Sequence, residues 1–143
     1  MMKQLIPVTR LFLILLFLGM SSCEKEIPLS EAIIGKWEVQ SVRAVTSQAG
    51  VKKSETTIYL ESEELAVQFA DDGAGIWYEN GETSGLFDWE LSGSTLTIMF
   101  GINSIDWDVE IDGNTLIWSY TDTEVIDQVT YDLEYFYTAK KTS

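Results

Sequence analysis

The stretch Asn103-Ser-Ile-Asp-Trp-Asp-Val-Glu-Ile-Asp112 decides the fold class, because apolar and acidic side chains alternate along most of its length. Ile105, Trp107, Val109 and Ile111 share one face, and the acidic residues between them share the other. Successive side chains of an extended chain point to opposite sides. The stretch therefore predicts an antiparallel strand with one buried and one solvent-exposed face.

The same two-residue period recurs along the chain from about residue 33 onward. Turn-forming residues separate the apolar runs, among them Asn80-Gly81 and Gly113-Asn114, which adopt positive φ at little cost. Short strands that follow one another every ~8 to 12 residues, without a long helical pattern between them, are typical of an all-β meander. We therefore predict a single antiparallel up-and-down β-barrel of about eight strands. The other apolar runs are Leu65/Val67/Phe69, Phe87/Trp89/Leu91, Leu96/Ile98/Phe100, Leu116/Trp118/Tyr120 and Val129/Tyr131/Leu133/Tyr135/Tyr137.

The composition excludes several classes of function. The 143 residues contain no histidine, which excludes Ser-His-Asp and Cys-His catalytic sites and the usual His-ligated zinc or copper centres. Cys23 is the single cysteine, so no internal disulfide can form. Residues 23–143 hold 7 Lys and Arg against 23 Asp and Glu, a formal charge of −16. This charge repels phosphate backbones and argues against nucleic-acid binding.

The first 22 residues have the pattern of an export signal. Lys3 and Arg10 precede an uninterrupted apolar run over residues 11–18, and the small residues Ser21 and Ser22 follow it. The alternative is a transmembrane helix, which needs ~20 apolar residues, more than this run supplies. We therefore predict a signal peptide over residues 1–22.

The residues around the predicted cleavage site resemble the lipobox of bacterial lipoproteins, with Met20 where leucine is more usual. The resemblance implies that Cys23 begins the mature protein and carries fatty acyl chains such as palmitate, which anchor the protein to a membrane. Charged residues at 24–26 resemble the signals that sort lipoproteins to the outer membrane of the cell envelope. The alternative is an ordinary signal peptide that leaves Cys23 as a free thiol. In the lipoprotein interpretation, residues 23–32 are the lipidated cysteine and a tether.

A second resemblance begins at Ile33-Ile34-Gly35-Lys36-Trp37-Glu38-Val39. A short turn followed by Gly-x-Trp at the head of the first strand resembles the lipocalin-like domain of small Gram-negative lipoproteins, here over residues 33–138, with 139–143 as a tail. The resemblance implies that Gly35 allows close backbone passage and that Trp37 plugs one end of the barrel. Classical lipocalins pack an arginine over this tryptophan, and Lys140 or Lys141 would have to replace it here.

Aromatic residues are the candidates for a ligand site. Several tryptophans lie on faces that are otherwise aliphatic, so plain core packing competes with ligand binding as their role. Trp77 and Tyr78 are adjacent and must point to opposite faces, which predicts a contact at the barrel rim for one of them. If all the indole rings point inward, the barrel interior is filled and a ligand binds at the open rim. The predicted ligand-binding residues are Trp77, Tyr78, Trp89, Trp107, Trp118 and Tyr120.

The carboxylates do not predict a catalytic or metal site. Asp106, Asp108 and Glu110 lie ~7 Å apart on one face of a strand, a spacing that overlaps that of glycosidase acid/base pairs. Catalysis requires a buried carboxyl with a raised pKa, whereas an acidic face in water does the opposite. A calcium loop starting at Asp108 would place Ser119 where a bidentate glutamate is needed. We expect no cofactor and no metal.

Two functions follow from these features. The first is a lipid-anchored, non-catalytic, lipocalin-like binding module for a small apolar or amphipathic ligand. The alternative is a structural or accessory surface lipoprotein whose packed barrel docks onto an envelope protein. Interior volume separates them, because a void of roughly 300 Å³ or more lined by these aromatics favours a ligand, while a filled barrel with an exposed apolar patch favours a partner.

Overall fold

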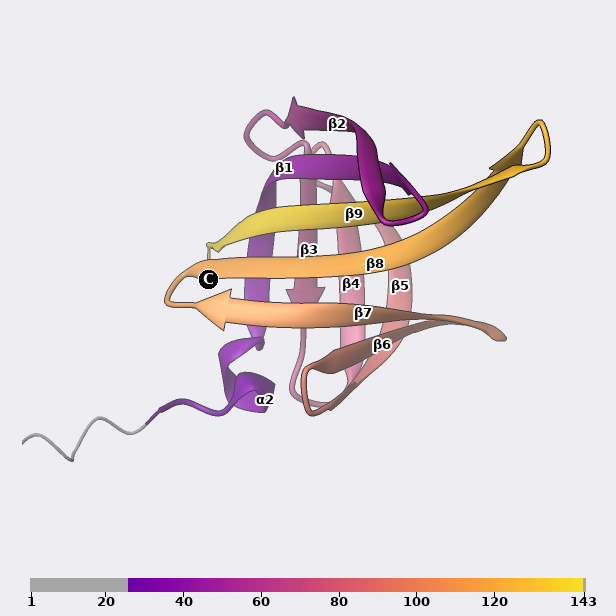
Figure 1. Ribbon diagram of the computed structural model, residues 1–143. Helices are drawn as coiled ribbons and strands as arrows, with labels where there is room; N and C mark the ends of the chain where they lie inside the picture. Colours follow the sequence, from indigo (N-terminus) through magenta and orange to yellow (C-terminus); the bar gives the residue numbers. More distant parts are fainter. Residues whose placement is uncertain (1–25, 143) are drawn as a thin grey trace, which may run out of the picture.

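The computed structural model describes residues 26–142, so the predicted signal peptide (1–22) and Cys23 lie outside the described residues. The described chain is almost entirely β-structure, as Figure 1 shows. One short helix precedes nine strands, and the all-β prediction is confirmed. The elements are α2 (Leu29–Ala32), β1 (Gly35–Gln48), β2 (Val51–Tyr59), β3 (Leu65–Phe69), β4 (Ala74–Glu79), β5 (Glu82–Ser92), β6 (Thr95–Phe100), β7 (Asn103–Asp112), β8 (Thr115–Ile126) and β9 (Val129–Lys141).

The strands form one antiparallel sheet that closes on itself between β1 and β9. Residues 35–38 of β1 pair with β3, and residues 41–48 of β1 pair with β2. The closed circuit therefore contains eight strands, and β2 is an additional strand outside it. The predicted up-and-down barrel is confirmed, with one strand more than closure needs. Among the described residues, no helix has the length and apolar character needed to cross a membrane.

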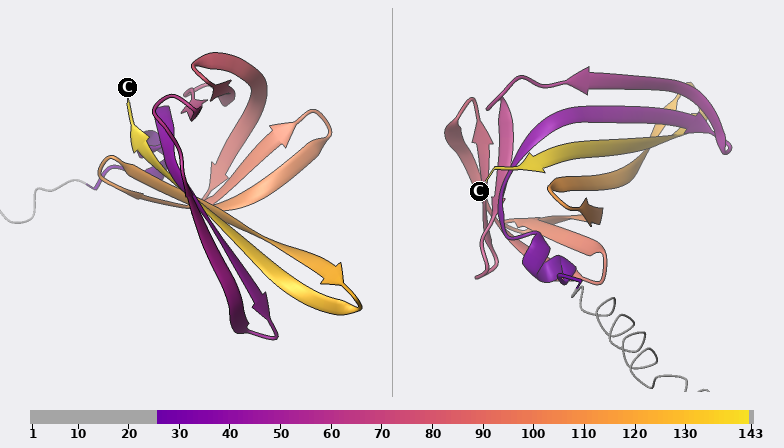
Figure 2. Two further views of the ribbon diagram at one scale, coloured as in Figure 1. Left: turned by 90° about the horizontal axis from the view of Figure 1, so that it is seen from above. Right: turned by 90° about the vertical axis from the view of Figure 1, so that its left-hand side faces the viewer.

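A bulge in β1 allows this strand to exchange one partner for another. Its pairing with β9 shifts between Val39 and Ser41, and the Gln40 carbonyl accepts a hydrogen bond from the Leu60 N–H at 2.9 Å. A bulge bends its strand and increases the local twist. Beyond it, β2, the second half of β1, and the outer parts of β8 and β9 continue past the barrel as a sheet extension (Figure 2).

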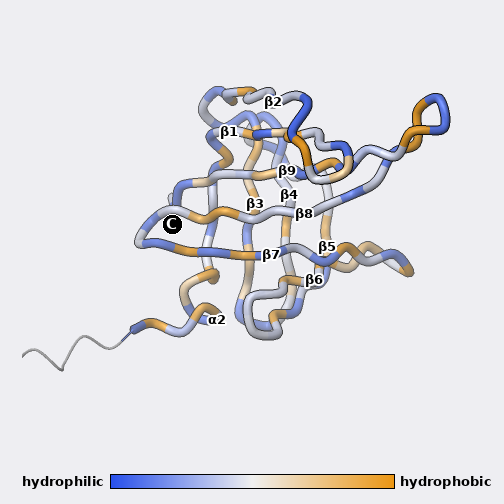
Figure 3. Tube along the Cα trace, viewed as in Figure 1, coloured by the Kyte–Doolittle hydropathy of each residue, from blue (hydrophilic) through white to orange (hydrophobic). Residues whose placement is uncertain are grey.

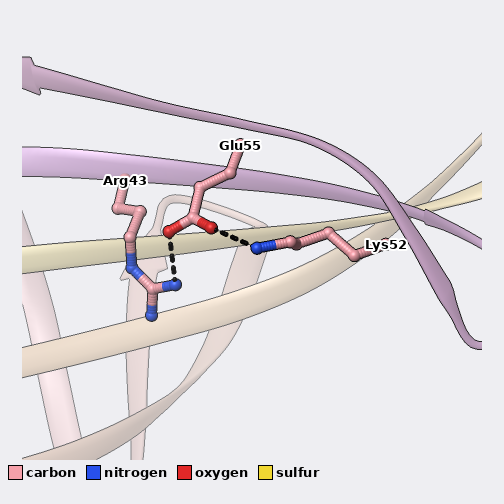
Figure 4. A network of polar contacts seen from close by, with 3 residues as sticks. All are labelled: Arg43, Lys52 and Glu55. Atoms are coloured by element: carbon pink, nitrogen blue, oxygen red, sulfur yellow. Dashed lines mark hydrogen bonds and ion pairs between the residues drawn. The ribbon is translucent and has the colours of Figure 1, made fainter.

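The sheet extension is held by backbone pairing and by surface charges. In Figure 4, Glu55 accepts hydrogen bonds from Lys52 Nζ at 2.7 Å and from Arg43 Nη1 at 3.2 Å. The hydrogen bond from Lys52, followed by that from Arg43, lowers the pKa of the Glu55 carboxyl below its ordinary value. Such exposed pairs contribute little to stability, and every residue of β2 is exposed.

The hydrophobic core lies inside the barrel and is built from the strand faces that the alternation predicts. Trp37, Leu96, Leu116 and Trp118 are each at most 1 % exposed. Acidic residues of the same strands, such as Asp106, point to solvent. The buried cluster consists of Ile33, Trp37, Val39, Val67, Phe69, Phe87, Leu96, Ile98, Trp107, Val109, Leu116, Trp118 and Ala139.

Trp37 closes one end of the barrel, where its side chain is fully buried. Its Nε1 donates a hydrogen bond of 2.8 Å to the Ile33 carbonyl. Gly35 has φ 130°, a conformation that residues with a Cβ rarely adopt. Lys141 lies over the ring, with Nζ 5.4 Å from the centroid, while Lys140 donates to Thr115 Oγ1 instead. Lys141 therefore occupies the place expected for one of these two lysines.

The bounds of the last strand and of the first helix differ by a few residues from the expected segment boundaries. The tail was expected to begin at residue 139, but β9 continues to Lys141 because Ala139 is fully buried and Lys140 and Lys141 stay paired with their neighbours. The tether was expected to reach residue 32. A short turn or 3₁₀ segment from Leu29 to Ile34 was expected within the same region, and Leu29–Ala32 form the short helix α2, with Leu29 packed against the core.

Candidate functional site

The end of the barrel opposite Trp37 is open because neighbouring strands separate there. β5 and β6 pair only from Asp88–Ser92 to Thr95–Met99. β7 and β8 pair only from Asp108–Asp112 to Thr115–Ser119. The remaining lengths of these strands diverge into three groups, which Figure 2 shows from above. Beyond the last paired residues, inward-facing side chains are therefore no longer covered by the neighbouring strand. We call this open end the mouth.

A cavity of about 560 Å³ lies at the mouth and opens to solvent. Seven of its ten lining residues come from β4, β5, β7 and β8, and the other three come from β3, β6 and β9. Five of the ten are aromatic, and Glu79 is the only charged one. The lining residues are Leu65, Trp77, Glu79, Ser84, Gly85, Phe100, Ile105, Trp107, Tyr120 and Tyr137.

One wall of the cavity is a cluster of aromatic rings around Trp107. The Trp107 ring meets Tyr120 at a centroid distance of 4.5 Å and Tyr137 at 5.5 Å, both in edge-to-face geometry. Trp118 stacks on Tyr137, its cross-strand partner, and Tyr135 stacks on Tyr120 in the same way. Within the described residues, the buried indole N–H groups of Trp107 and Trp118 have no hydrogen-bond acceptor. Ring contacts of this kind, worth about 0.5–1.5 kcal/mol each, therefore hold this wall.

The facing wall is a second aromatic cluster centred on Phe87. Phe87 contacts Trp77 at 5.7 Å, Phe69 at 5.8 Å and Phe100 at 5.9 Å between ring centroids. Trp77 and Phe100 project from this cluster into the cavity. Packing on three sides fixes the Phe87 ring and so fixes the two rings that line the cavity. The site is therefore preformed.

The tyrosines of the mouth lie in a desolvated and negatively charged environment. Burial, followed by the neighbouring Tyr135, raises the pKa of the Tyr137 phenol above its ordinary value. Burial also raises the pKa of Tyr120, and the nearby Tyr137, Tyr135 and Asp122 add to the shift. Both phenols are therefore neutral at physiological pH and offer ring faces and hydroxyl groups to a ligand.

The six predicted ligand-binding residues do not all meet in one place. Trp77, Trp107 and Tyr120 line the cavity. Trp118 is 1 % exposed and lies in the core beneath it. Trp89 lies at the β3–β4 turn at the closed end, and Tyr78 lies on the outer surface.

Trp89 and Tyr78 have local structural contacts. The Trp89 indole donates to the carbonyls of Ala70 at 3.1 Å and Ala74 at 2.9 Å, so it fastens the β3–β4 turn. The Tyr78 hydroxyl donates to Gln68 Oε1 at 2.8 Å on the outer face, and Lys36 covers its ring. The prediction that Trp77 and Tyr78 point to opposite faces is confirmed, and Trp77 is the one at the mouth.

Sequence reasoning missed most of the other lining residues. Phe100, Ile105 and Tyr137 were recognised as members of apolar faces but were not assigned to a site. The available signal was their position, since Phe100 and Ile105 flank the turn at residues 101–102, where apolar residues are not needed for a core. Nothing in the sequence marks Gly85 as a cavity residue. In the structure it borders open space, since an added Cβ there would meet no atom within 4 Å.

The described residues contain no group of three or more Cys, Asp or Glu side chains arranged to hold a metal ion. Asp106, Asp108 and Glu110 are exposed on the outer face of β7. Comparison of the chain with protein-family models, with curated proteins and with solved structures finds no significant match.

Proposed function

We propose that this protein is a lipid-anchored, non-catalytic binding module that holds a small apolar or amphipathic molecule in the mouth of its barrel. The observation that supports this most is the cavity of about 560 Å³ between the two aromatic walls. Ligand pockets commonly have volumes of ~300–1,000 Å³ and combine apolar walls with a few polar groups. The core beneath is filled, so the ligand would occupy the mouth rather than the barrel centre.

The position of the expected anchor agrees with this function. Helix α2 lies at the end of the barrel closed by Trp37, and residues 26–28 join the helix at that end (Figure 1). A protein anchored through acylated Cys23 to the outer membrane would turn its closed end toward that membrane. The mouth would then face the aqueous compartment, from which a ligand could enter.

A cavity-filling substitution tests the proposal. Gly85→Phe should place a ring in open space within the cavity, since an added Cβ meets nothing within 4 Å. We expect it to weaken binding of the neutral fluorescent probe N-phenyl-1-naphthylamine at least tenfold. Leu86→Phe is the matched control, because Leu86 is the next residue and is 72 % exposed on the other face. Failure of the wild type to bind, or equal binding by both variants, would refute the proposal.

One observation favours the alternative, a surface lipoprotein that docks onto an envelope protein. Ile102 at the β6–β7 turn is fully exposed, and Val125 and Ile126 near the β8–β9 turn are at least half exposed. Figure 3 shows apolar segments at the β6–β7 turn and on both sides of the β8–β9 turn, whose own residues are hydrophilic. In host cells, a photo-crosslinking residue at position 102 should then form one defined adduct. The same residue at position 59, on exposed β2, serves as the control.

A further inference from the structure

The basic residues of the described chain lie away from the cavity. Lys36 covers Tyr78 on the outer surface with Nζ 4.2 Å from the ring centroid, and Arg43 covers Phe136 at 4.1 Å. Lys141 lies over Trp37 at the closed end. Of the others, Lys52 is paired with Glu55, Lys140 bonds Thr115, and Lys53 lies on β2, a strand that does not contribute to the cavity.

Acidic residues occupy inward-facing positions at the mouth, where Glu79 lines the cavity, and beyond it on the outer part of β8. Glu79 lines the cavity and is paired in register with Glu82, so both side chains lie on the same face of the sheet. Asp122 and Glu124 follow Tyr120 at steps of two residues and therefore share its inward face. The negative charge of Asp122 reaches this region, since it is one of the causes of the raised pKa of Tyr120, after burial and the neighbouring tyrosines. We call these four carboxylates the acidic rim.

Together these features favour one chemical class of ligand. An ammonium group is attracted to the faces of aromatic rings and to carboxylates, and the cavity combines five rings with Glu79. A carboxylate ligand such as a fatty acid would meet the acidic rim with no basic partner among the lining residues. Deepening the function proposed above, on which this inference rests, we propose that the cavity selects cationic amphiphiles: an apolar tail between Trp77 and Trp107 and an ammonium head at Glu79.

Three amphiphiles with the same tail test this selectivity. Octylammonium, octanol and octanoate differ only in the head group, so their relative affinities report the charge preference of the site. The full-length chain in phosphatidylcholine nanodiscs is titrated with each, and binding is followed by tryptophan fluorescence, because Trp77 and Trp107 line the cavity. We expect octylammonium to bind tightest and octanoate weakest.

Two single substitutions assign the preference to Glu79. Glu79→Gln should weaken octylammonium binding about fivefold, the effect of one charge pair close to water, and leave octanol within twofold. Glu79→Lys should reverse the order of octylammonium and octanoate. Glu110→Gln is the matched control, since it removes one negative charge from the outer face of β7. Comparing variants in the same nanodiscs cancels partition of each amphiphile into the lipid, and unchanged melting temperatures confirm that each variant is folded.

The outcomes separate this inference from the function on which it rests. If none of the three amphiphiles changes the fluorescence, the proposed binding function itself is wrong. If they bind but octanoate is as tight as octylammonium, or if Glu79→Gln and Glu110→Gln have equal effects, the selectivity for cations is wrong while the binding function stands.

Discussion

Gly75 offers a sharp test of how tightly the aromatic wall around Phe87 is packed. A Cβ added at Gly75 would overlap three atoms of the Phe87 ring. The ring is 5 % exposed and cannot move without disturbing its contacts with Phe69, Trp77 and Phe100. Overpacking of this kind costs about 1–3 kcal/mol. We therefore expect Gly75→Ala to lower the free energy of unfolding by about 2 kcal/mol.

The same substitution at Gly85 is the control, because an added Cβ there meets no atom within 4 Å. Gly85→Ala should be neutral or stabilise the protein by up to about 1 kcal/mol, since alanine restricts the unfolded chain. Urea denaturation followed by tryptophan fluorescence gives both values. A double-mutant cycle with Phe87→Leu should show a coupling of about 1 kcal/mol, because the smaller side chain leaves room for the methyl group. Equal stability of the two alanine variants would refute the packing described for this wall.

Three further predictions follow. Trp37→Ala should lower the free energy of unfolding by about 3–5 kcal/mol, because it leaves a buried cavity. In a domain of this size each kcal/mol shifts the melting temperature by roughly 4 °C. A melting temperature within about 2 °C of the wild type would therefore contradict a core role for Trp37. Cys23→Ser should abolish incorporation of labelled palmitate in host cells, and persistent label would place the acyl chain elsewhere. Burial raises the pKa of Tyr137 and Tyr120 in the folded protein. Their contribution to the free energy of unfolding is therefore complete below about pH 10, and it is lost as the pH rises through the folded-state pKa values. Phenolate absorbance should therefore appear at higher pH in the folded than in the unfolded protein. Titration curves that coincide would contradict the burial of these phenols.

The sequence was sufficient to predict the barrel because its alternation is local. Leu96 and Ile98 face inward for the same reason as Trp107 and Val109, and a two-residue period assigns both without knowledge of their neighbours. Gly35 and Trp37 likewise marked the closed end through a short motif. The bulge near Gln40 has no comparable signal, so the exchange of partners in β1 and the sheet extension were not foreseen.

The cavity was only half predictable, because it depends on where paired strands separate. Trp107 and Tyr120 were predicted as aromatic residues on apolar faces and Trp77 as a possible contact at the rim, and all three line the cavity. Trp118 and Trp89 satisfied the same rule and lie in the core and at the β3–β4 turn. What distinguishes them is position relative to the last paired residues, such as Asp108 and Ser119, and a single sequence does not contain that register.

The ninth strand has a consequence for handling the protein. Within the described chain β2 pairs only with β1, so one side of its nine residues presents unsatisfied backbone groups. Strand addition at that side is disfavoured by the charged side chains of Lys52 and Lys53 and by the repulsion between highly acidic molecules. At acid pH, where the net negative charge is lost, this repulsion disappears. Acidified solutions should then self-associate through β2, and sedimentation velocity would detect dimers that disappear on return to neutral pH.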